Sequence, residues 1–239
     1  MTLLQSHSLR AFVRVAAGIS LAVLAACASP PSRFYTLGSE GGSTVTVRDR
    51  TVSPAILIDM RPVTVPSAVA RSQLVVQVNA TQVNVLEDDR WASPLSDEIR
   101  NAMLGAVTRQ SGAVDVHGMA RADNVTVYDV SVDVQRFETW PGSHVLIDLV
   151  WTVRPSSSQE AMTCHSTVIR SVSAGYDAIV DGHRQALQRI ATQIAQGIRE
   201  LVKTPTVHLG RQAATHSMSC PSMVEAETTI DAPISGAAQ

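Results

Sequence analysis

Large apolar residues recur at every second position in Val145, Ile147, Leu149, Trp151 and Val153, and this pattern constrains the fold more than any other feature of the 239-residue chain. Alternation with a period of two places the apolar side chains on one face of a β-strand and the polar ones on the other. Two further strand candidates flank it, at residues 125–134 and 161–172. Consecutive strands with short links predict an antiparallel meander. A one-residue slip in the first run predicts a β-bulge near Tyr128–Asp129.

Two amphipathic helices accompany these strands. The first has Ser93 as its expected N-cap and Pro94 in the first helical position, and it ends before Gly112. The second covers residues 177–202. The apolar stripes comprise Leu95, Ile99, Ala102, Met103, Ala106 and Val107 in the first helix, and Leu187, Ile190, Ala191, Ile194, Ile198, Leu201 and Val202 in the second. A helix with a single apolar stripe must bury it against another layer.

More strand candidates precede the first helix. They are residues 33–37, 55–65, 74–78 and 82–86. The second of them is apolar on both faces, which predicts a place in the middle of a sheet, and Pro62 predicts a bulge or strand end near Arg61. We therefore predict an α+β fold, with a single two-layer domain over residues 33–203. Its mainly antiparallel or mixed sheet carries both helices on one face, and the other face meets solvent or a partner.

The N-terminus has the pattern of a secretory signal. Arg10 and Arg14 precede about a dozen mostly apolar residues, too few for a transmembrane helix, which needs about 20. The run ends in Leu24, Ala25, Ala26 and Cys27, which resembles the lipobox of bacterial lipoproteins. An ordinary cleaved signal followed by a chance cysteine is the alternative.

The lipoprotein interpretation divides the chain into a signal peptide (1–26), a tether (27–32), the folded domain (33–203) and a tail (204–239). In such lipoproteins the cysteine thiol, here that of Cys27, receives diacylglycerol, and its amino group an acyl chain such as palmitate. Each buried CH₂ contributes about 0.8 kcal/mol, so two or three chains hold a domain on a membrane. Ala28, instead of Asp, follows the cysteine, which by analogy predicts the periplasmic face of the outer membrane. The tail lacks any periodicity and is predicted to be disordered.

Charge and motif spacing exclude several classes of function. The single lysine, Lys203, lies far from any glycine-rich loop, which excludes a P-loop ATPase, and no basic block suggests a nucleic-acid partner. The scattered histidines include His117, His144, His165, His183, His208 and His216. None has metal-ligand or nucleophile-elbow spacing, so we predict no catalytic residue, no metal and no cofactor beyond the covalent lipid.

Two adjacent pairs of polar residues have simple structural interpretations. Asp88 and Asp89 come shortly before the first helix and are interpreted as a solvated turn. Cys164 and His165 are neighbours on a predicted strand, so their side chains point to opposite faces and cannot act as nucleophile and base.

Cys164 and Cys220 leave two interpretations open. The periplasm permits disulfides, and a bridge over so long a loop stabilises a fold by about 4 kcal/mol in the chain-entropy model. Such a bridge would also tie the tail to the domain. Alternatively, Cys164 shares its strand face with Met162 and Val168 and is a small buried residue with a free thiol.

The three tryptophans differ in their sequence context. Trp91 precedes the first helix, where an aromatic residue either packs as a hydrophobic staple or contacts a partner. Trp151 belongs to the alternating strand and is predicted to lie in the core. Trp140 comes directly before Pro141 and Gly142 at a hairpin tip, which makes it a candidate for an exposed partner contact.

Several segments together resemble one family. The most specific is Arg90–Leu95, which contains Trp-Ala-Ser-Pro-Leu at the start of a helix. The weaker ones are Phe34–Leu37, Val63–Pro66, Arg71–Val76, Gly175–Tyr176 and the Ile190–Leu201 stripe. The set is similar to the PqiC-like family of ABC-type transport auxiliary lipoproteins, over about residues 33–202. Ser67–Ala68 departs from the family pattern, and the tail beyond Pro205 has no counterpart in it.

The resemblance implies a non-enzymatic lipoprotein of the outer membrane. Members of this family work with an inner-membrane ABC transporter or a related membrane protein, and with an MCE-domain protein that bridges the periplasm. Together these move phospholipids or other hydrophobic molecules between membranes, and the lipoproteins can form homo-oligomeric rings. The alternative is a structural adaptor for envelope or cell-wall assembly without a transport role. A periplasmic hydrolase would require a cleft with an activated nucleophile.

Overall fold

The computed structural model describes residues 31–38, 56–120, 125–158, 160–203 and 219–222. The chain divides into the units Met1–Arg33 and Phe34–Gln239, and the elements below belong to the second, except that strand β1 begins at Arg33. The predicted signal peptide, lipobox and Cys27 lie outside the described residues, as does the tail apart from residues 219–222. No helix in the described ranges is both long and apolar enough to cross a bilayer.

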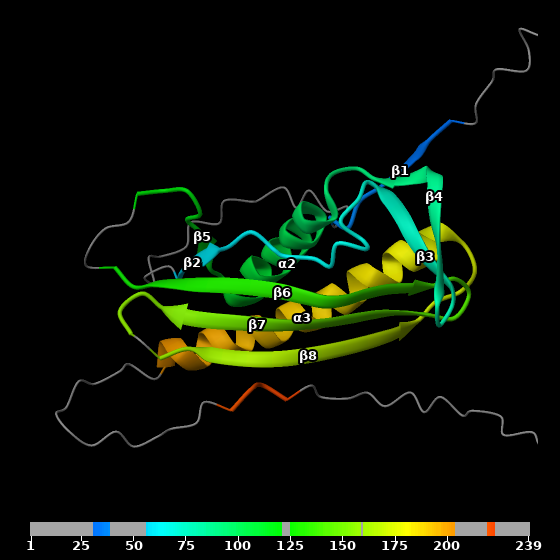
Figure 1. Ribbon diagram of the computed structural model, residues 1–239. Helices are drawn as coiled ribbons and strands as arrows, with labels where there is room; N and C mark the ends of the chain where they lie inside the picture. Colours follow the sequence, from blue (N-terminus) through cyan, green and yellow to red (C-terminus); the bar gives the residue numbers. More distant parts are fainter. Residues whose placement is uncertain (1–30, 39–55, 121–124, 159, 204–218, 223–239) are drawn as a thin grey trace, which may run out of the picture. The chain divides into compact units, whose positions relative to one another are not determined.

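Five strands form the larger sheet, in the order β5-β2-β6-β7-β8 (Figure 1). Their bounds are Leu57–Met60 for β2, Val114–Asp115 for β5, Val127–Trp140 for β6, His144–Pro155 for β7 and Met162–Ser171 for β8. The predicted antiparallel meander is present as β6, β7 and β8. Strand β2 runs parallel to both neighbours, so the sheet is mixed and β2 lies inside it, as its apolar faces predict.

The predicted bulge near Tyr128–Asp129 is wrong. Strand β6 pairs with β7 without a break from Tyr128 to Val134, and the register shifts between Val134 and Arg136 instead. Val127 is buried although it lies on the other parity from Val130, Val132 and Val134, and its backbone is hydrogen-bonded to Ser156 in the loop after β7. The true bulge brings Phe137 onto the face that carries the core.

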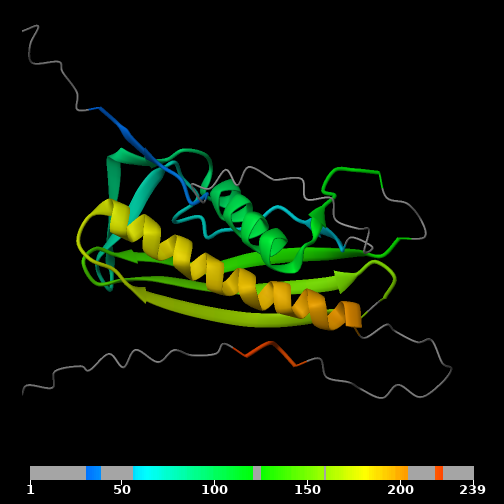
Figure 2. The same ribbon diagram turned by 180° about the vertical axis from the view of Figure 1, so that it is seen from behind.

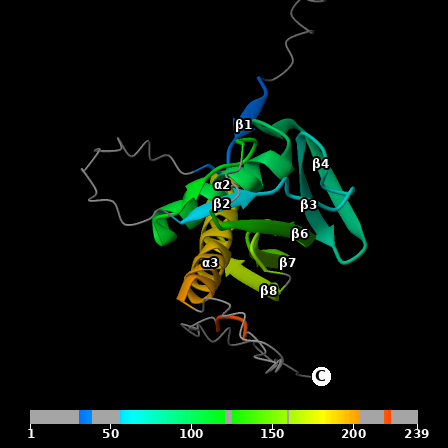
Figure 3. The ribbon, with the colours of Figure 1, turned by 90° about the vertical axis from the view of Figure 1, so that its left-hand side faces the viewer.

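A second, three-stranded sheet contains three of the four strands that precede helix α2. Its order is β1-β4-β3, with β1 at Arg33–Tyr35, β3 at Gln73–Asn79 and β4 at Gln82–Trp91. We expected one sheet. Strand β2 instead ends at Met60, since Pro62 cannot donate to a ladder, and Thr64 pairs with β6 as an isolated bridge. The chain then forms the β3–β4 hairpin, which stands beside β6 (Figure 3).

Both helices cover the same face of the larger sheet, as predicted (Figure 2). Helix α2 covers Leu95–Ser111 and α3 covers Tyr176–Lys203. Their stripes pack with the alternating residues of β7, including Trp151, in one core. Val202 is the exception, because 40% of its surface is exposed at the helix end.

The two ends of α2 are closed differently. Gly112 stops the helix in a left-handed conformation (φ 71°), which glycine adopts at little cost. The predicted Ser93 cap is wrong, because Pro94 occupies the N-cap position and no side chain caps the helix. The Ser93 hydroxyl instead donates to the carboxylate of Glu98.

The sheet face opposite the helices is mostly polar. Its exposed side chains include Ser131, Asp133 and Gln135 on β6 and Thr163, His165 and Thr167 on β8. Ile169 is the large apolar residue among the exposed side chains of β8. Of the two predicted alternatives for this face, its composition matches contact with solvent.

Candidate functional site

A buried carboxylate joins the start of the folded unit to helix α2. Glu98 is 5% exposed, and it accepts hydrogen bonds from the Thr36 hydroxyl (2.7 Å), the Leu37 backbone N–H (2.8 Å) and the Ser93 hydroxyl (2.6 Å). A carboxylate taken out of water requires such donors, and bonds to a charged acceptor are stronger than neutral ones. Glu98 thereby fixes the segment after β1 to the first turn of α2.

The same segment is also held by β4 and α3. The Tyr35 carbonyl accepts from the backbone N–H of Ala92 (2.8 Å), and its phenol donates to Asp89 (3.1 Å). Arg184 of α3 donates to the Thr36 carbonyl (2.8 Å). We call Tyr35, Thr36, Leu37, Ser93, Glu98 and Arg184 the N-terminal clamp. Because the bonds of Thr36 and Leu37 join them to residues more than 60 positions away in sequence, the clamp exists only in the folded protein.

Trp91 lies in the core beside the clamp, and of the two alternatives that the sequence leaves open for it, this burial favours packing over a partner contact. Only 5% of its surface is exposed, and its ring meets Phe137 edge-on with the centroids 6.2 Å apart. The ring contact is with β6, whereas the staple interpretation placed it against the first turn of the helix. The Trp-Ala-Ser-Pro-Leu segment thus supplies a core aromatic, a clamp hydroxyl and the start of α2.

His183 of α3 lies directly behind Phe137. The two rings stack with centroids 4.0 Å apart, and Nε2 lies 2.8 Å from the Thr139 hydroxyl. Complete burial lowers the pKa of His183 to about 3, because the imidazolium cannot be solvated there. The ring is therefore neutral at physiological pH, and it fills the core instead of carrying protons.

The interpretation of Asp88 and Asp89 as a solvated turn is wrong. Both belong to strand β4, and Asp89 is 4% exposed and accepts the Tyr35 phenol. The prediction for Cys164 and His165 is confirmed, because the first is buried and the second exposed on opposite faces of β8.

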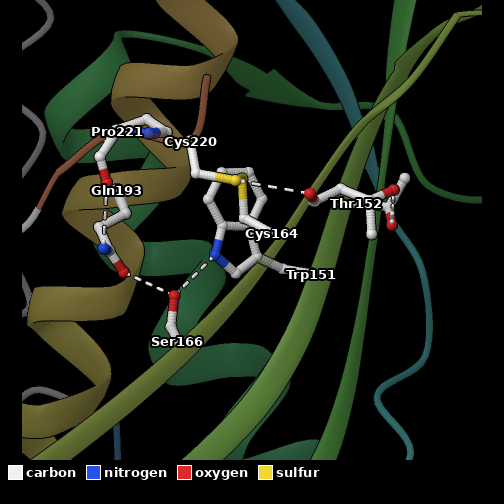
Figure 4. Close-up of a disulfide and its surroundings, with 8 residues drawn as sticks. Trp151, Thr152, Cys164, Ser166, Gln193, Cys220 and Pro221 are labelled. Atoms are coloured by element: carbon white, nitrogen blue, oxygen red, sulfur yellow. Dashed lines mark hydrogen bonds between the residues drawn. A yellow bond between two sulfur atoms is a disulfide. The ribbon is translucent and has the colours of Figure 1, made fainter. Parts of the chain in front are cut away.

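Cys164 and Cys220 are joined by a disulfide, with their Cα atoms 5.7 Å apart (Figure 4). Cys164 is buried on the core face of β8, and Cys220 belongs to the short described segment 219–222. The Cys220 sulfur also lies 3.4 Å from the Thr163 carbonyl oxygen. Of the two interpretations left open by the sequence, the structure shows the bridge.

A buried chain of hydrogen bonds runs from the core to the same segment. Trp151 Nε1 donates to Ser166 (3.0 Å), whose hydroxyl donates to Gln193 Oε1 (2.7 Å). The Gln193 amide nitrogen then donates to the Pro221 carbonyl (3.3 Å) (Figure 4). Residues 219–222 are therefore held against β8 and α3 by a covalent and a polar contact.

Trp140 lies at the end of β6 and is half-buried. Its ring stacks on His144 with centroids 5.6 Å apart, and its Nε1 donates to Glu138 (3.1 Å). These contacts orient the indole at the hairpin tip. Contact between Trp140 and a partner remains a prediction.

Charged residues gather where β2 ends. The buried Asp59 lies 2.7 Å from His117 Nδ1 and 3.7 Å from Arg61, which also bonds Asp129. Arg100 of α2 donates to the Met60 carbonyl there. Within the described ranges, the His117 ring bonds to Asp59 and its backbone N–H bonds to Asp115. Neither of these partners is a hydroxyl or a thiol that the imidazole could activate as a nucleophile. The described residues contain no cluster of three or more His, Cys, Asp or Glu suited to a metal ion.

Sequence reasoning missed the residues that hold this arrangement together. Glu98 lies in the first turn of a helix, where an acidic side chain is expected only to interact favourably with the positive end of the helix dipole. Gln193 lies among apolar residues of α3, and nothing in its sequence context signals a polar contact to the tail. Their partners are 62 and 28 residues away, respectively.

Comparison with known proteins agrees with the fold. The family model described as ABC-type transport auxiliary lipoprotein component matches residues 35–195. A crystal structure of an uncharacterized protein is similar with a TM-score of 0.55 and 20% identity, covering 71% of this chain and 99% of its own. Protein XCC0632 from Xanthomonas campestris has a TM-score of 0.50 and 21% identity, covering 63% of this chain and 89% of its own. No curated protein matches significantly.

Proposed function

The chain belongs to the family of ABC-type transport auxiliary lipoprotein components, and from this membership we propose that it is a membrane-anchored, non-enzymatic accessory subunit of an envelope transport system. In this role the protein binds and positions other components. The matched region begins at residue 35, inside the N-terminal clamp, and ends within α3, so it includes strands β2 to β8 and helix α2.

The N-terminal clamp is the observation that carries this role. A lipid on Cys27 would reach the fold through residues 27–32, which span at most about 20 Å when fully extended. The chain then enters β1, and Glu98 and Arg184 bind it within the next few residues. A protein that works while attached by its N-terminus needs such a junction, because any pull on the anchor acts first on this segment.

The finer features of the proposal follow the family resemblance. The anchor would lie in the periplasmic leaflet of the outer membrane, with Cys27 carrying diacylglycerol and an N-acyl chain. The partners would be an MCE-domain protein that bridges the periplasm and inner-membrane transporter components, with phospholipids or other hydrophobic molecules as cargo. Several copies would form a homo-oligomeric ring, and Trp140 is the candidate contact residue.

Cell fractionation and copurification of a Cys27→Ser variant test the proposal. Wild-type protein should sediment with the outer membrane and copurify, from detergent extracts, with an MCE-domain protein and transporter subunits. The Cys27→Ser protein should leave the outer-membrane fraction and lose these partners, because acyl chains on the cysteine provide the membrane affinity.

Cys220→Ser is the matched control, since it also replaces a cysteine with serine but leaves the anchor site intact. It should stay in the outer-membrane fraction. Sedimentation of Cys27→Ser with the outer membrane would contradict the anchor. Copurification of cell-wall assembly proteins alone would favour the structural adaptor.

A further inference from the structure

Three turns at one end of the described fold contain no Asp, Glu, Lys or Arg. They are the β3–β4 turn, the β6–β7 turn and the link from β8 to α3, and they lie within the uncharged runs 72–86, 139–147 and 171–176. Charged residues make up 17% of the chain, so runs of this combined length would ordinarily contain several. The β7–β8 turn at the opposite end, by contrast, carries the exposed Arg154 and Glu160.

The register of the strands brings these turns together. His144 pairs with Trp140 of β6 and with Ser171 of β8, and the Val172 backbone N–H donates to the Ser143 carbonyl (2.9 Å). The β3–β4 turn lies beside them, since β3 packs against β6 and its hairpin stands at the same end in Figure 1 and Figure 2. We call this part of the fold the neutral end, and it comprises residues 78–83, 140–144 and 171–176.

The neutral end also exposes apolar side chains. Val78 and Val83 flank the β3–β4 turn with 55% and 49% of their surfaces exposed, and Trp140 is half-buried beside the β6–β7 turn. The nearest acidic side chain before Trp140 in the sequence is Glu138, which pairs with Arg136 (2.8 Å) and accepts the indole N–H. Exposed apolar groups without charge around them favour contact with an apolar surface over contact with water.

The place where the chain enters the fold indicates which surface this is. Strand β1 belongs to the same three-stranded sheet as the β3–β4 hairpin and is paired with β4. Phe34 of β1 is 66% exposed and lies seven residues after Cys27, a separation of at most about 25 Å. An anchor on Cys27 would therefore hold this small sheet close to the bilayer.

We propose that the neutral end lies against the lipid bilayer that carries the anchor. Tryptophan and aliphatic side chains are favourable in the interfacial region of a membrane, whereas a charged side chain there costs free energy because it leaves water. Lipid headgroups can also rearrange around each of three separate turns. Because the turns are uncharged, the contact needs no anionic lipid and should persist at high salt.

The choice of a bilayer rests on the proposed anchor at Cys27, so the test attaches the protein without lipidation in the cell. Cys164 and Cys220 form the disulfide, which leaves Cys27 as the one thiol of the oxidised full chain. A phospholipid that carries a maleimide group therefore couples the purified protein to phosphatidylcholine vesicles at that position. The vesicle measurement examines the neutral end alone, and fractionation of Cys27→Ser examines the natural anchor.

Quenching of tryptophan fluorescence by phosphatidylcholine brominated in its acyl chains measures the contact. Trp91 and Trp151 are buried, so the quenching should come from Trp140 and should be lost in Trp140→Phe. The double variant Val78→Glu with Val83→Glu should also lose it, because each glutamate would place a charge at the bilayer. In the wild type, quenching should persist at high salt.

The matched control is the double variant Val114→Glu with Val202→Glu. These valines are 50% and 40% exposed, on β5 and in the last turn of α3, which lie at the opposite end of the described fold (Figure 1). The control should be quenched like the wild type, and circular dichroism checks that each variant is folded. Equal quenching of the two double variants would overturn the proposal. Absence of quenching in the coupled wild type would also overturn it, and would leave a protein as the partner of Trp140.

Discussion

Glu98 and His183 show two ways in which a buried titratable side chain is accommodated. Glu98 keeps hydrogen-bond donors around its carboxylate, and two of them, Thr36 and Leu37, belong to the segment that the protein must hold. His183 has one polar neighbour, Thr139, and avoids the cost of a buried charge by remaining neutral. The first residue therefore organises the N-terminal clamp, and the second contributes an aromatic surface beside Phe137.

The low pKa of His183 predicts that acid destabilises the fold. Its pKa is about 3 in the folded protein and 6.5 in an unfolded chain, so only the unfolded state binds the proton between these values. This contribution to the free energy of unfolding is fully present above pH 6.5 and falls by about 1.4 kcal/mol per pH unit below it, or about 2 kcal/mol at pH 5. Urea unfolding at pH 5 and pH 7 measures the loss.

His183→Gln should show a smaller difference between pH 5 and pH 7 than the wild type, because the substituted residue does not titrate. The control is His165→Gln on the exposed sheet face, which should retain the wild-type difference. An unchanged pH dependence in His183→Gln would contradict the assignment to this residue.

At the scale of the elements, two glycines set how closely α3 approaches the sheet. A Cβ at Gly182 would overlap Val172 Cγ1, and one at Gly197 would lie 2.9 Å from Met162 Sδ and 3.1 Å from Trp151 Cη2. Each glycine costs a helix about 1 kcal/mol relative to alanine. The fold bears this cost because the helix lies directly on the side chains below it.

The same substitution should therefore have opposite effects at two helix positions. Gly182→Ala should lower the free energy of unfolding by about 1–3 kcal/mol, the usual cost of overpacking a core. Gly105→Ala on α2 meets only the flexible end of Arg109 and should raise it by up to about 1 kcal/mol. Urea titration of both variants measures the difference, and a stabilised Gly182→Ala protein would contradict the close approach.

At the scale of the whole molecule, the disulfide links a segment beyond the last helix to the edge strand of the larger sheet. Cys164 and Cys220 are 56 residues apart in sequence, and α3 lies between them. The Gln193–Pro221 hydrogen bond holds the same segment from the helix side. The folded unit therefore includes residues 219–222, although the chain from 204 to 218 lies outside the described residues.

Removing the bridge should lower stability without changing the core. Cys220 is exposed, so Cys220→Ser breaks the bridge and leaves the buried Cys164 as a free thiol. The free energy of unfolding should fall by up to about 4 kcal/mol, the chain-entropy value for a loop of this length. Urea unfolding with and without reductant measures the effect. Reductant should lower the midpoint of the wild type to that of Cys220→Ser and leave the variant unchanged; an effect on the variant would contradict this origin.

Local patterns in the sequence were enough to predict both helices, the β6–β8 meander and the core position of Trp151. They were also enough to place β2 inside the sheet and to end it near Arg61. Periodicity succeeds there because the apolar residues that share one face of a helix or strand are close to one another along the chain. Their spacing therefore shows which face is buried. The family resemblance was likewise visible in short segments and agrees with the matched region.

Contacts between distant segments required the folded chain. The bonds from Thr36 to Glu98, the disulfide, the neutral end and the split into two sheets each depend on where separate elements meet. The misplaced bulge has a similar origin, since Val127 is buried on the other parity of β6 and its backbone bonds to Ser156, a residue beyond β7. A one-dimensional pattern records that a side chain is buried, but only the three-dimensional arrangement identifies what buries it.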